Sequence, residues 1–432
     1  MAAVTPPSLS PRRRTLYDDC VHCGFCLPAC PTWHSWSEEM DSPRGRIDLM
    51  RGLAEGKLEW TDTVARHFDR CLGCLGCVTA CPSGVRYDVL IEETRAARER
   101  ARPRSTADRL FREALFAVLP YPARLRAVAV LAGLYEKSGL RRLVQKSGAL
   151  GLLPQRLAAL ESLLPAAAPA DRLPERVAPA GGGAPRARVA LVTGCVQSVF
   201  FPGINAATAR VLAAEGCEVV VPPDQGCCGA LSIHAGRETE SFAFARALIE
   251  KFESGGYDAI LINAAGCGSH LKDYGRLLAK DPVWARRASE FRARVRDVTE
   301  FLAGLPPRAA RHPIPARVAY HDACHLAHGQ GIRQPPRRLL SAIPGVTLVE
   351  IADGEQCCGS AGIYNLVEPE SADEIGERKV EHVLAAEADV LASANPGCLL
   401  QIGKHARRRG ARLPAYHPIE ILDASIAGRP LS

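Results

Sequence analysis

Two cysteine runs with the same spacing constrain the fold of this 432-residue chain more than any other feature. The runs are Cys20-x2-Cys23-x2-Cys26-x3-Cys30-Pro31 and Cys71-x2-Cys74-x2-Cys77-x3-Cys81-Pro82. Three thiolates at this spacing wrap one corner of a [4Fe–4S] cluster, and in two-cluster proteins the fourth cysteine ligates the other cluster. Zinc sites use only two Cys-x2-Cys pairs, so four cysteines per run with a following proline favour iron–sulfur clusters.

This rule assigns the eight cysteines to two clusters. Cluster 1 takes Cys20, Cys23, Cys26 and Cys81, and cluster 2 takes Cys71, Cys74, Cys77 and Cys30. Between the runs, Asp41-Ser-Pro-Arg-Gly-Arg-Ile47 predicts the start of a helix, so we expect the clusters to lie in a helical frame. We expect packing or surface roles for His22, His34 and His67, because the cysteines already supply eight ligands.

The C-terminal half contains an internal repeat. Three cysteine-bearing stretches recur at offsets of 129, 130 and 131 residues: Arg188-Val-Ala-Leu-Val-Thr-Gly-Cys195 with Arg317-Val-Ala-Tyr-His-Asp-Ala-Cys324, Gln225-Gly-Cys-Cys-Gly229 with Glu355-Gln-Cys-Cys-Gly359, and 258–267 with 389–398. A pattern that returns three times at a nearly constant offset indicates a duplicated unit.

Each repeated unit alternates short apolar runs with helical patterns. In the first unit we expect strands at 189–192, 218–221 and 259–262, with helices at 206–214 and 238–252. This alternation predicts a parallel sheet with right-handed crossovers. Because ligands bind beyond the carboxyl ends of parallel strands, the cysteines that follow the strands should converge on one site per unit.

Each converging site would hold four thiols, and the sequence leaves their occupant open. The two sets are Cys195, Cys227, Cys228 and Cys267, and Cys324, Cys357, Cys358 and Cys398. Adjacent thiolates repel unless a metal neutralises them, so an iron–sulfur cluster or zinc fits, whereas a redox-active dithiol and buried structural thiols are the alternatives. His321, His325 and His328 occur together only in the second unit and could serve a quinone, a metal, a partner chain or packing.

The rest of the composition excludes several classes of protein. Of the 17 cysteines only Cys217 is left over, and we expect it to be structural filler. Residues 1–14 lack an apolar core and no run of 18 apolar residues occurs, so we expect neither a secretory signal nor a membrane span. A cytoplasmic location, with thiols kept reduced, is therefore expected.

The basic excess of the chain is local. Residues 95–146 hold thirteen Arg and Lys against four acids, a net charge of +9, while the whole chain carries +7. A nucleic-acid-binding face is therefore not expected. Apolar residues recur at helical spacing here, which predicts basic amphipathic helices that either pack on the protein, the alternative we favour, or lie peripherally on the inner face of the cytoplasmic membrane. An Ala/Pro/Gly-rich linker follows at 165–185.

The chain resembles the iron–sulfur subunit of bacterial glycolate oxidase (glycolate dehydrogenase) from about residue 19 to 423, most weakly between 100 and 187. The stretches that carry the resemblance are 19–31, 41–47, 69–74, 80–85, 193–197, 205–208, 226–231, 263–268, 324–333 and 357–362. The wider group that combines two [4Fe–4S] runs with a duplicated cysteine-rich unit includes lactate-utilisation, anaerobic glycerol-3-phosphate dehydrogenase and heterodisulfide reductase subunits. Heterodisulfide-reductase-type units end in Cys-x-x-Cys, whereas His270 and Gln401 stand at the last position here.

The resemblance implies an electron-transfer subunit of an oxidoreductase. FAD-bearing partner chains would oxidise glycolate or another 2-hydroxy acid, and the electrons would reach a quinone-type or other membrane acceptor. In agreement, no Gly-x-Gly-x-x-Gly follows a predicted strand, so we expect FAD on the partner subunit only. A subunit of a lactate or glycerol-3-phosphate dehydrogenase and a heterodisulfide-reductase-like thiol/disulfide enzyme are the alternatives.

We therefore predict a multi-domain α+β chain. It would comprise a helical ferredoxin-type domain at 15–100, a basic helical segment with a linker at 101–187, and two cysteine-rich α/β units at 188–310 and 316–428.

Overall fold

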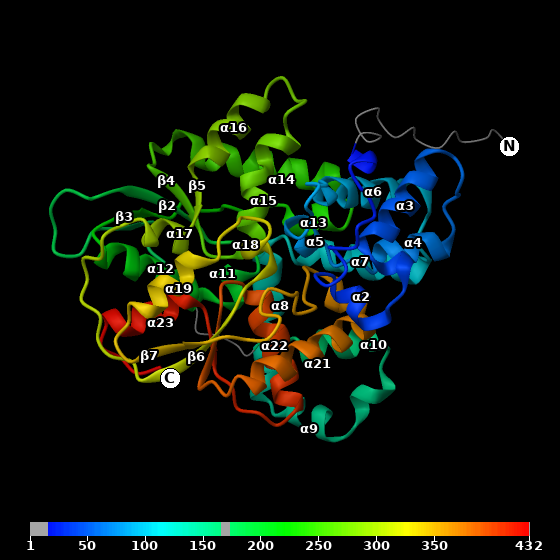
Figure 1. The fold of residues 1–432 in the computed structure, drawn as a ribbon. Coiled ribbons are helices and arrows are strands. Elements are labelled where there is room, and N and C mark those ends of the chain that lie inside the picture. The colour runs from blue at the N-terminus through cyan, green and yellow to red at the C-terminus, as the bar shows by residue number, and fades with distance from the viewer. Residues whose placement is uncertain (1–15, 166–172, 432) are drawn as a thin grey trace.

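The structure is a computed structural model that describes residues 16–165 and 173–431. Residues 1–14, for which we expect no secretory signal, lie outside the described residues, and so does part of the linker expected at 165–185. Figure 1 shows a helical N-terminal domain, in blue, beside two α/β units whose sheets lie on the opposite side of the molecule. The predicted fold class is therefore confirmed.

The N-terminal domain consists of short helices around one core. They are α2 (Pro31–Trp36), α3 (Pro43–Ala54), α4 (Asp62–Asp69), α5 (Gly76–Thr79) and α6 (Tyr87–Ala101). The predicted helix α3 starts after Ser42, whose hydroxyl accepts a hydrogen bond from the Gly45 N–H at 3.0 Å, and Pro43 fills the first turn, where its missing N–H costs nothing. The core residues include Ile47, Met50, Phe68, Leu90 and Ile91, together with Cys71 and Cys77.

The basic segment folds into four α-helices and the short 3-10 helix η2 (Ala149–Leu152). The α-helices are α7 (Thr106–Val118), α8 (Pro122–Lys137), α9 (Leu140–Lys146) and α10 (Gln155–Ser162). Helix α7 buries Leu115 and Phe116 against the second cysteine-rich unit, as the packing alternative predicts. Helix α8 differs, because Val130, Leu131 and Leu134 are 60–65% exposed. Helix α7 therefore packs on the protein, whereas most of the apolar surface of α8 does not.

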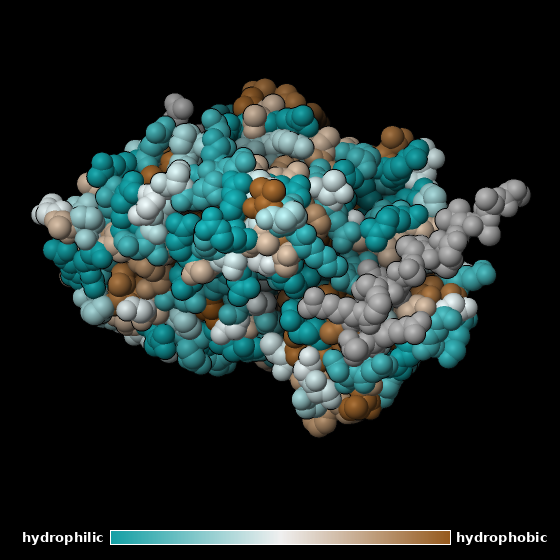
Figure 2. Space-filling model, turned by 90° about the horizontal axis from the view of Figure 1, so that it is seen from above, coloured by the Kyte–Doolittle hydropathy of each residue, from teal (hydrophilic) through white to brown (hydrophobic). Residues whose placement is uncertain are grey.

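The described part of the chain contains no single helix that is long and apolar enough to cross a membrane. Helices α7 and α8 together reach that length and composition, but they meet at an angle of 101°. Figure 2 shows a face with mainly hydrophilic side chains, on which hydrophobic side chains gather at a few places.

Each cysteine-rich unit contains a sheet with a parallel core. The first sheet has the order β1-β3-β2-β4-β5, and its strands are β1 (Arg176–Val177), β2 (Arg188–Val192), β3 (Glu218–Val220), β4 (Ala259–Ile262) and β5 (Val295–Asp297). The second has the order β7-β6-β8-β9, and its strands are β6 (Ala316–His321), β7 (Val346–Val349), β8 (Val390–Ser393) and β9 (Ala415–Tyr416). The predicted parallel pairing is confirmed, whereas the antiparallel edge strand β1 lies inside the expected linker and was not predicted.

The helices of the two units also correspond. The first unit has α11 (Gln197–Phe200), α12 (Pro202–Ala214), α13 (Ala230–His234), α14 (Glu238–Phe252), α15 (Ala265–Leu277), α16 (Ala285–Arg294) and α17 (Val298–Ala303). The second has α18 (Cys324–Ala327), α19 (Gln334–Ser341), α20 (Tyr364–Val367), α21 (Pro369–Ala385), α22 (Pro396–Arg408) and α23 (Pro418–Ile426). The repeat extends to α17 and α23, which both begin with a capping box, from Asp297 and from His417.

The two units share one hydrophobic core. Helix α12 of the first unit packs on α23 of the second, and α17 packs on α19. Val189, Leu191 and Leu212 of the first unit therefore belong to the same buried cluster as Leu340 and Ile421 of the second. Neither unit buries this face alone, so the pair behaves as a single body.

Candidate metal centres

The predicted ligands of cluster 1 line one cavity. Cys20, Cys23, Cys26 and Cys81 all line it, together with Cys77, which the assignment gives to cluster 2. Cys81 belongs to the second run, so the fold brings the last cysteine of one run to the first three of the other, which is the arrangement the assignment requires. Burial raises the pKa of Cys26 to about 11, so binding of iron there must displace a proton. The assignment itself remains a prediction.

The predicted ligands of cluster 2 lie deeper in the domain. Cys30, Cys71 and Cys77 are buried and Cys74 is half-buried. The Gly73 N–H and the Tyr87 hydroxyl donate hydrogen bonds to Cys71 Sγ at 3.4 and 3.6 Å. Burial opposes ionisation of Cys71, but nearby arginine charges and these donors outweigh it and lower the pKa. Burial raises the pKa of Cys77, and the neighbouring thiols of this group raise it further.

The donor set fits two [4Fe–4S] clusters. All eight predicted ligand atoms are sulfur, the donor that such clusters take. The backbone also wraps closely around the thiols: Gly73 adopts a φ of +66°, and a Cβ on Gly76 would lie 2.9 Å from the Ala29 carbonyl oxygen. Glycine at position 76 therefore lets the second run approach the backbone of the first.

The four thiols of the first cysteine-rich unit converge beyond the carboxyl ends of its strands. The sulfurs of Cys195 and Cys227 lie 3.5 Å apart. Hydrogen bonds from Cys227 and Cys267 lower the pKa of Cys228 well below its usual range, against the effect of burial. The turn depends on Gly229, whose φ is +88°. The topology thus brings together cysteines that are up to 72 residues apart in the sequence.

The second unit repeats this convergence with a different charge pattern. Hydrogen bonds with neighbouring thiols lower the pKa of Cys324 and Cys358 well below the usual range of a thiol. The same bonds raise the pKa of Cys357 and Cys398. A lowered thiol pKa favours the thiolate, which is the form that binds a metal.

The second thiol site lies against Cys74, a predicted ligand of cluster 2. Cys74 packs on a buried group that contains Leu72, Cys324, Cys357 and Tyr364. The Tyr364 hydroxyl donates to the carbonyl oxygen of Arg70 at 3.0 Å, which ties the helical domain to the second unit at this point. The chain thus places two groups of thiols in direct contact across a domain boundary.

Comparisons with known proteins agree with this arrangement. Residues 17–85 match the 4Fe-4S dicluster domain, 189–272 and 318–403 match the Cysteine-rich domain, and 107–164 match the linker region of the glycolate oxidase iron-sulfur subunit. The chain is 39% identical over 412 residues to the probable glycolate oxidase iron-sulfur subunit of Bacillus subtilis (strain 168), covering 94% of this chain and 93% of the relative. It belongs to the family of glycolate oxidase iron–sulfur subunits. The recognition made from the sequence is therefore confirmed.

Other relatives show how far the similarity extends. The glycolate oxidase iron-sulfur subunit of Escherichia coli (strain K12) is 33% identical over 413 residues, which are 94% of this chain and 93% of the relative. Lactate utilization protein A of Exiguobacterium sp. is 31% identical over 239 residues, which are 55% of this chain and 98% of that protein. Membership of the glycolate oxidase family thus rests on nearly the whole chain, whereas the lactate-utilisation relative aligns with about half.

A buried ion-pair network beside Cys71, a predicted ligand of cluster 2, was not predicted from the sequence of this family member. Arg46 is 1% exposed and donates to Asp41 Oδ1 at 3.1 Å and to the carbonyl oxygen of His67 at 2.6 Å. The fully buried Asp41 also accepts from Arg70 at 2.8 Å and bonds to the His67 ring at 3.0 Å. The signal was present in the sequence, because Asp41 and Arg46 lie in the stretch that predicted only a helix start. The Arg46 charge lies beside Cys71 and favours its thiolate.

A second unpredicted feature is a polar network beneath the first thiol site. Gln197 donates to Asn205 Oδ1 at 2.8 Å and also to Asn263, while the Asn263 amide donates to Asn205 Oδ1 at 3.0 Å and to Thr208 at 2.8 Å. These residues come from the stretches 193–197, 205–208 and 263–268, which carried the family resemblance. Their buried amides fix the loops that present Cys195 and Cys267.

The three histidines of the second unit have three different surroundings. His328 shares a hydrogen bond of 2.7 Å with Thr79 and therefore helps to dock the helical domain. His325 Nδ1 lies 3.4 Å from Cys324 Sγ. The His325 ring contacts the His234 ring edge-on, with 5.0 Å between the ring centroids. His321 ends strand β6 and faces the second thiol site.

Proposed function

We propose that the chain is the electron-transfer subunit of a flavin-dependent glycolate (2-hydroxy acid) dehydrogenase. In this proposal it takes electrons from FAD on a partner dehydrogenase subunit and passes them to a quinone-type acceptor. The observation that carries the proposal is that the eight cysteines of both runs lie in one helical domain, where Cys20, Cys23, Cys26 and Cys81 line the same cavity. The names of the relatives that align over nearly the whole chain support the substrate.

The chain's own residues would hold two one-electron carriers in fixed positions. Cys20, Cys23, Cys26 and Cys81 would bind cluster 1, and Cys71, Cys74, Cys77 and Cys30 would bind cluster 2. The clusters supply reversible one-electron transfer when bound, at potentials set by charge, hydrogen bonds and exposure. Cluster 1 lies nearer the surface, because Cys23 is exposed, so we place the partner's FAD on that side.

The two thiol sites of the cysteine-rich units add to the metal sites that we propose for this chain. We propose that one or both thiol sites hold a further metal or cluster, since ionised neighbouring thiols need a counter-charge. The domains would then be 15–100 for the two clusters, 101–187 for the helical segment and linker, and 188–310 and 316–428 for the two thiol sites.

The exposed apolar surface of α8 and α9 supports a location at the inner face of the cytoplasmic membrane. Val130, Leu131, Leu134 and Leu143 are each at least 60% exposed. Arginines and lysines lie among them at Arg124, Arg126, Lys137, Arg142 and Lys146. Such a surface suits anionic lipid headgroups, where a quinone is available.

The decisive experiment uses the chain purified anaerobically with its FAD-bearing partner subunits. We expect about eight iron atoms per chain from the two clusters and an absorbance near ~400 nm that glycolate bleaches. Cys74→Ser should lower the iron content and the bleaching, whereas Cys217→Ser, which changes a buried cysteine far from either run in sequence, should leave both unchanged. Glycolate that reduces the flavin but leaves the ~400 nm band intact would show that the chain does not accept these electrons.

Two other functions remain testable in the same preparation. L-lactate that bleaches the band faster than glycolate would favour a lactate dehydrogenase subunit, for which the 31% identity to Lactate utilization protein A is the supporting observation. Turnover of a disulfide substrate that is lost in Cys227→Ser and Cys357→Ser would instead favour a thiol/disulfide enzyme.

A further inference from the structure

The two thiol sites differ in the histidine that accompanies them. In the first unit His270 stands three residues after Cys267, whereas in the second unit the corresponding residue after Cys398 is Gln401. The second unit instead has His321 at the end of β6, where the first unit has Val192 at the end of β2. The duplicated site therefore carries its imidazole on helix α15 in the first unit and at the end of strand β6 in the second.

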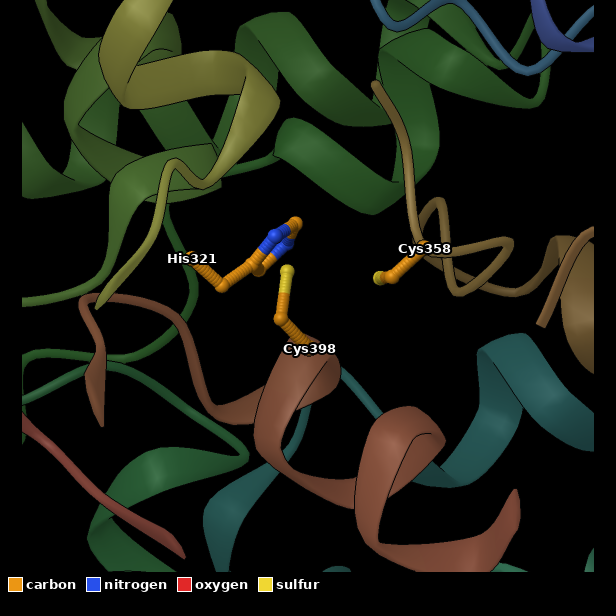
Figure 3. A group of neighbouring side chains, drawn as sticks. All are labelled: His321, Cys358 and Cys398. Atoms are coloured by element: carbon orange, nitrogen blue, oxygen red, sulfur yellow. The ribbon is translucent and has the colours of Figure 1, made fainter. Parts of the chain in front are cut away.

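His321 is aimed at two of the thiols. A ring nitrogen of His321 and the sulfurs of Cys358 and Cys398 all lie within 4.8 Å of one another, and all three residues are buried. Figure 3 shows the side chains pointing toward one another from β6, from the loop after β7 and from the start of α22. Three separate elements thus present two sulfurs and one imidazole to one point.

The hydrogen bonding of His321 is incomplete in a way that packing does not explain. Its side chain is 0% exposed, and neither ring nitrogen has a hydrogen-bond partner of good geometry among the described residues. The polar groups that the ring faces are the thiols of Cys358 and Cys398. Leaving a buried polar group unpaired costs about 1–3 kcal/mol. Other buried histidines do have partners: His67 bonds to Asp41, His270 to Ser241 and His405 to Glu377.

We propose that His321 is a metal ligand and that the second unit holds a transition-metal centre with mixed thiolate and imidazole ligands. Cys358 and Cys398 would bind together with His321, and Cys324 or Cys357 would complete the set. Imidazole and thiolate together suit zinc or iron, which are borderline to soft ions. A ligand bond would also satisfy one of the two ring nitrogens that the protein leaves unpaired.

This proposal rests on the part of the proposed function that places metal in the thiol sites, but not on the substrate or the electron acceptor. It gives the two sites different ligand sets, because Val192 cannot bind a metal. It also places the centre next to cluster 2, since Cys324 and Cys357 pack against Cys74.

The test is X-ray absorption at the iron and zinc edges of the full chain, purified anaerobically, with metal analysis. We expect metal beyond the roughly eight iron atoms of the two clusters. We also expect nitrogen scattering near about 2.0–2.1 Å with the multiple scattering of an imidazole ring. His321→Leu should remove that imidazole signal and lower the extra metal by at least half, while the ~400 nm band of the clusters stays.

Two further variants keep the result interpretable. His321→Cys supplies a thiolate at the same place and should restore the metal without the imidazole signal, which a purely structural role of the ring would not do. Val192→Ala changes the corresponding buried position of the first unit and should leave metal content and scattering unchanged.

Absence of any metal beyond the two clusters in the wild-type chain would overturn the proposal. So would an imidazole signal that persists in a folded His321→Leu chain. Either result leaves the glycolate-dependent bleaching test of the proposed function unaffected, so the two failures are distinguishable.

Discussion

Arg46 brings charge, burial and hydrogen bonding together beside Cys71, a predicted ligand of cluster 2. Arg46→Gln removes a positive charge next to Cys71, so the reduction potential of cluster 2 should fall, because a negatively charged centre loses a counter-charge. The change also leaves Asp41 with fewer partners, and breaking a buried ion pair costs about 3–5 kcal/mol. An EPR-monitored redox titration and a denaturant melt measure the two effects.

Arg44 on the same helix is the matched control. It pairs with Glu39 at 2.6 Å and is 27% exposed, so Arg44→Gln should cost about 1 kcal/mol or less. A folded Arg46→Gln chain whose cluster 2 potential equals that of the wild type would contradict this account.

Gly229 and Gly359 each follow a Cys-Cys pair. At both positions a positive φ and a close neighbouring atom disfavour any residue with a Cβ. Their φ values are +88° and +87°, and an added Cβ would lie 2.9 Å from the Ser241 oxygen and 2.7 Å from the Ala372 oxygen. Substitution by alanine should therefore destabilise the chain by more than about 1 kcal/mol, through strain and overlap together. Gly226→Ala isolates the strain, because its φ is +76° but nothing lies within 4 Å of its Cβ. If Gly226→Ala and Gly229→Ala lose the same free energy of unfolding in denaturant melts, steric overlap of the added Cβ does not contribute.

At the scale of elements, the two repeats cap equivalent helices with different chemistry. Asp297 begins α17 and His417 begins α23, and His417 Nδ1 accepts the Ile419 N–H at 3.1 Å. Burial lowers the pKa of His417 to about 3 and raises that of Asp297 to about 6. The two repeats thus share the capping geometry, but burial raises the pKa of the cap in the first unit and lowers it in the second.

This difference predicts an acid-sensitive helix start. His417 stays neutral in the folded chain, whereas the unfolded chain binds a proton below pH 6.5, so stability is lost as the pH falls from about 6.5 toward 3. The slope approaches about 1.4 kcal/mol per pH unit. His417→Asn keeps a good cap and does not titrate, so between pH 6.5 and 5 it should lose about 1–2 kcal/mol less than the wild type in urea melts. Parallel losses in the two proteins would show that His417 is not the sensitive group.

At the scale of the whole molecule, the exposed leucines of α8 predict a lipid-facing side. The chain should bind vesicles that contain anionic lipid, and binding should weaken as salt rises. Leu131→Ser with Leu134→Ser should weaken binding about tenfold or more, because two apolar side chains no longer enter the bilayer. Val283→Ser changes a residue that is 63% exposed in the first cysteine-rich unit and should have no effect. Vesicle co-sedimentation that is equal for all three proteins would place the docking surface elsewhere.

The sequence by itself determined the features that depend on short-range spacing. The two cysteine runs, the start of α3 and the repeated strands and helices could be predicted, because ligand spacing, capping and hydrophobic periodicity act over a few residues. The tertiary structure alone decided which surfaces meet: Cys74 against Cys324, Arg46 against Cys71, His321 against Cys358 and Cys398, and α8 left uncovered. The three contacts join elements that are distant in sequence, and they depend, like the exposure of α8, on how whole faces pack, which no local pattern encodes.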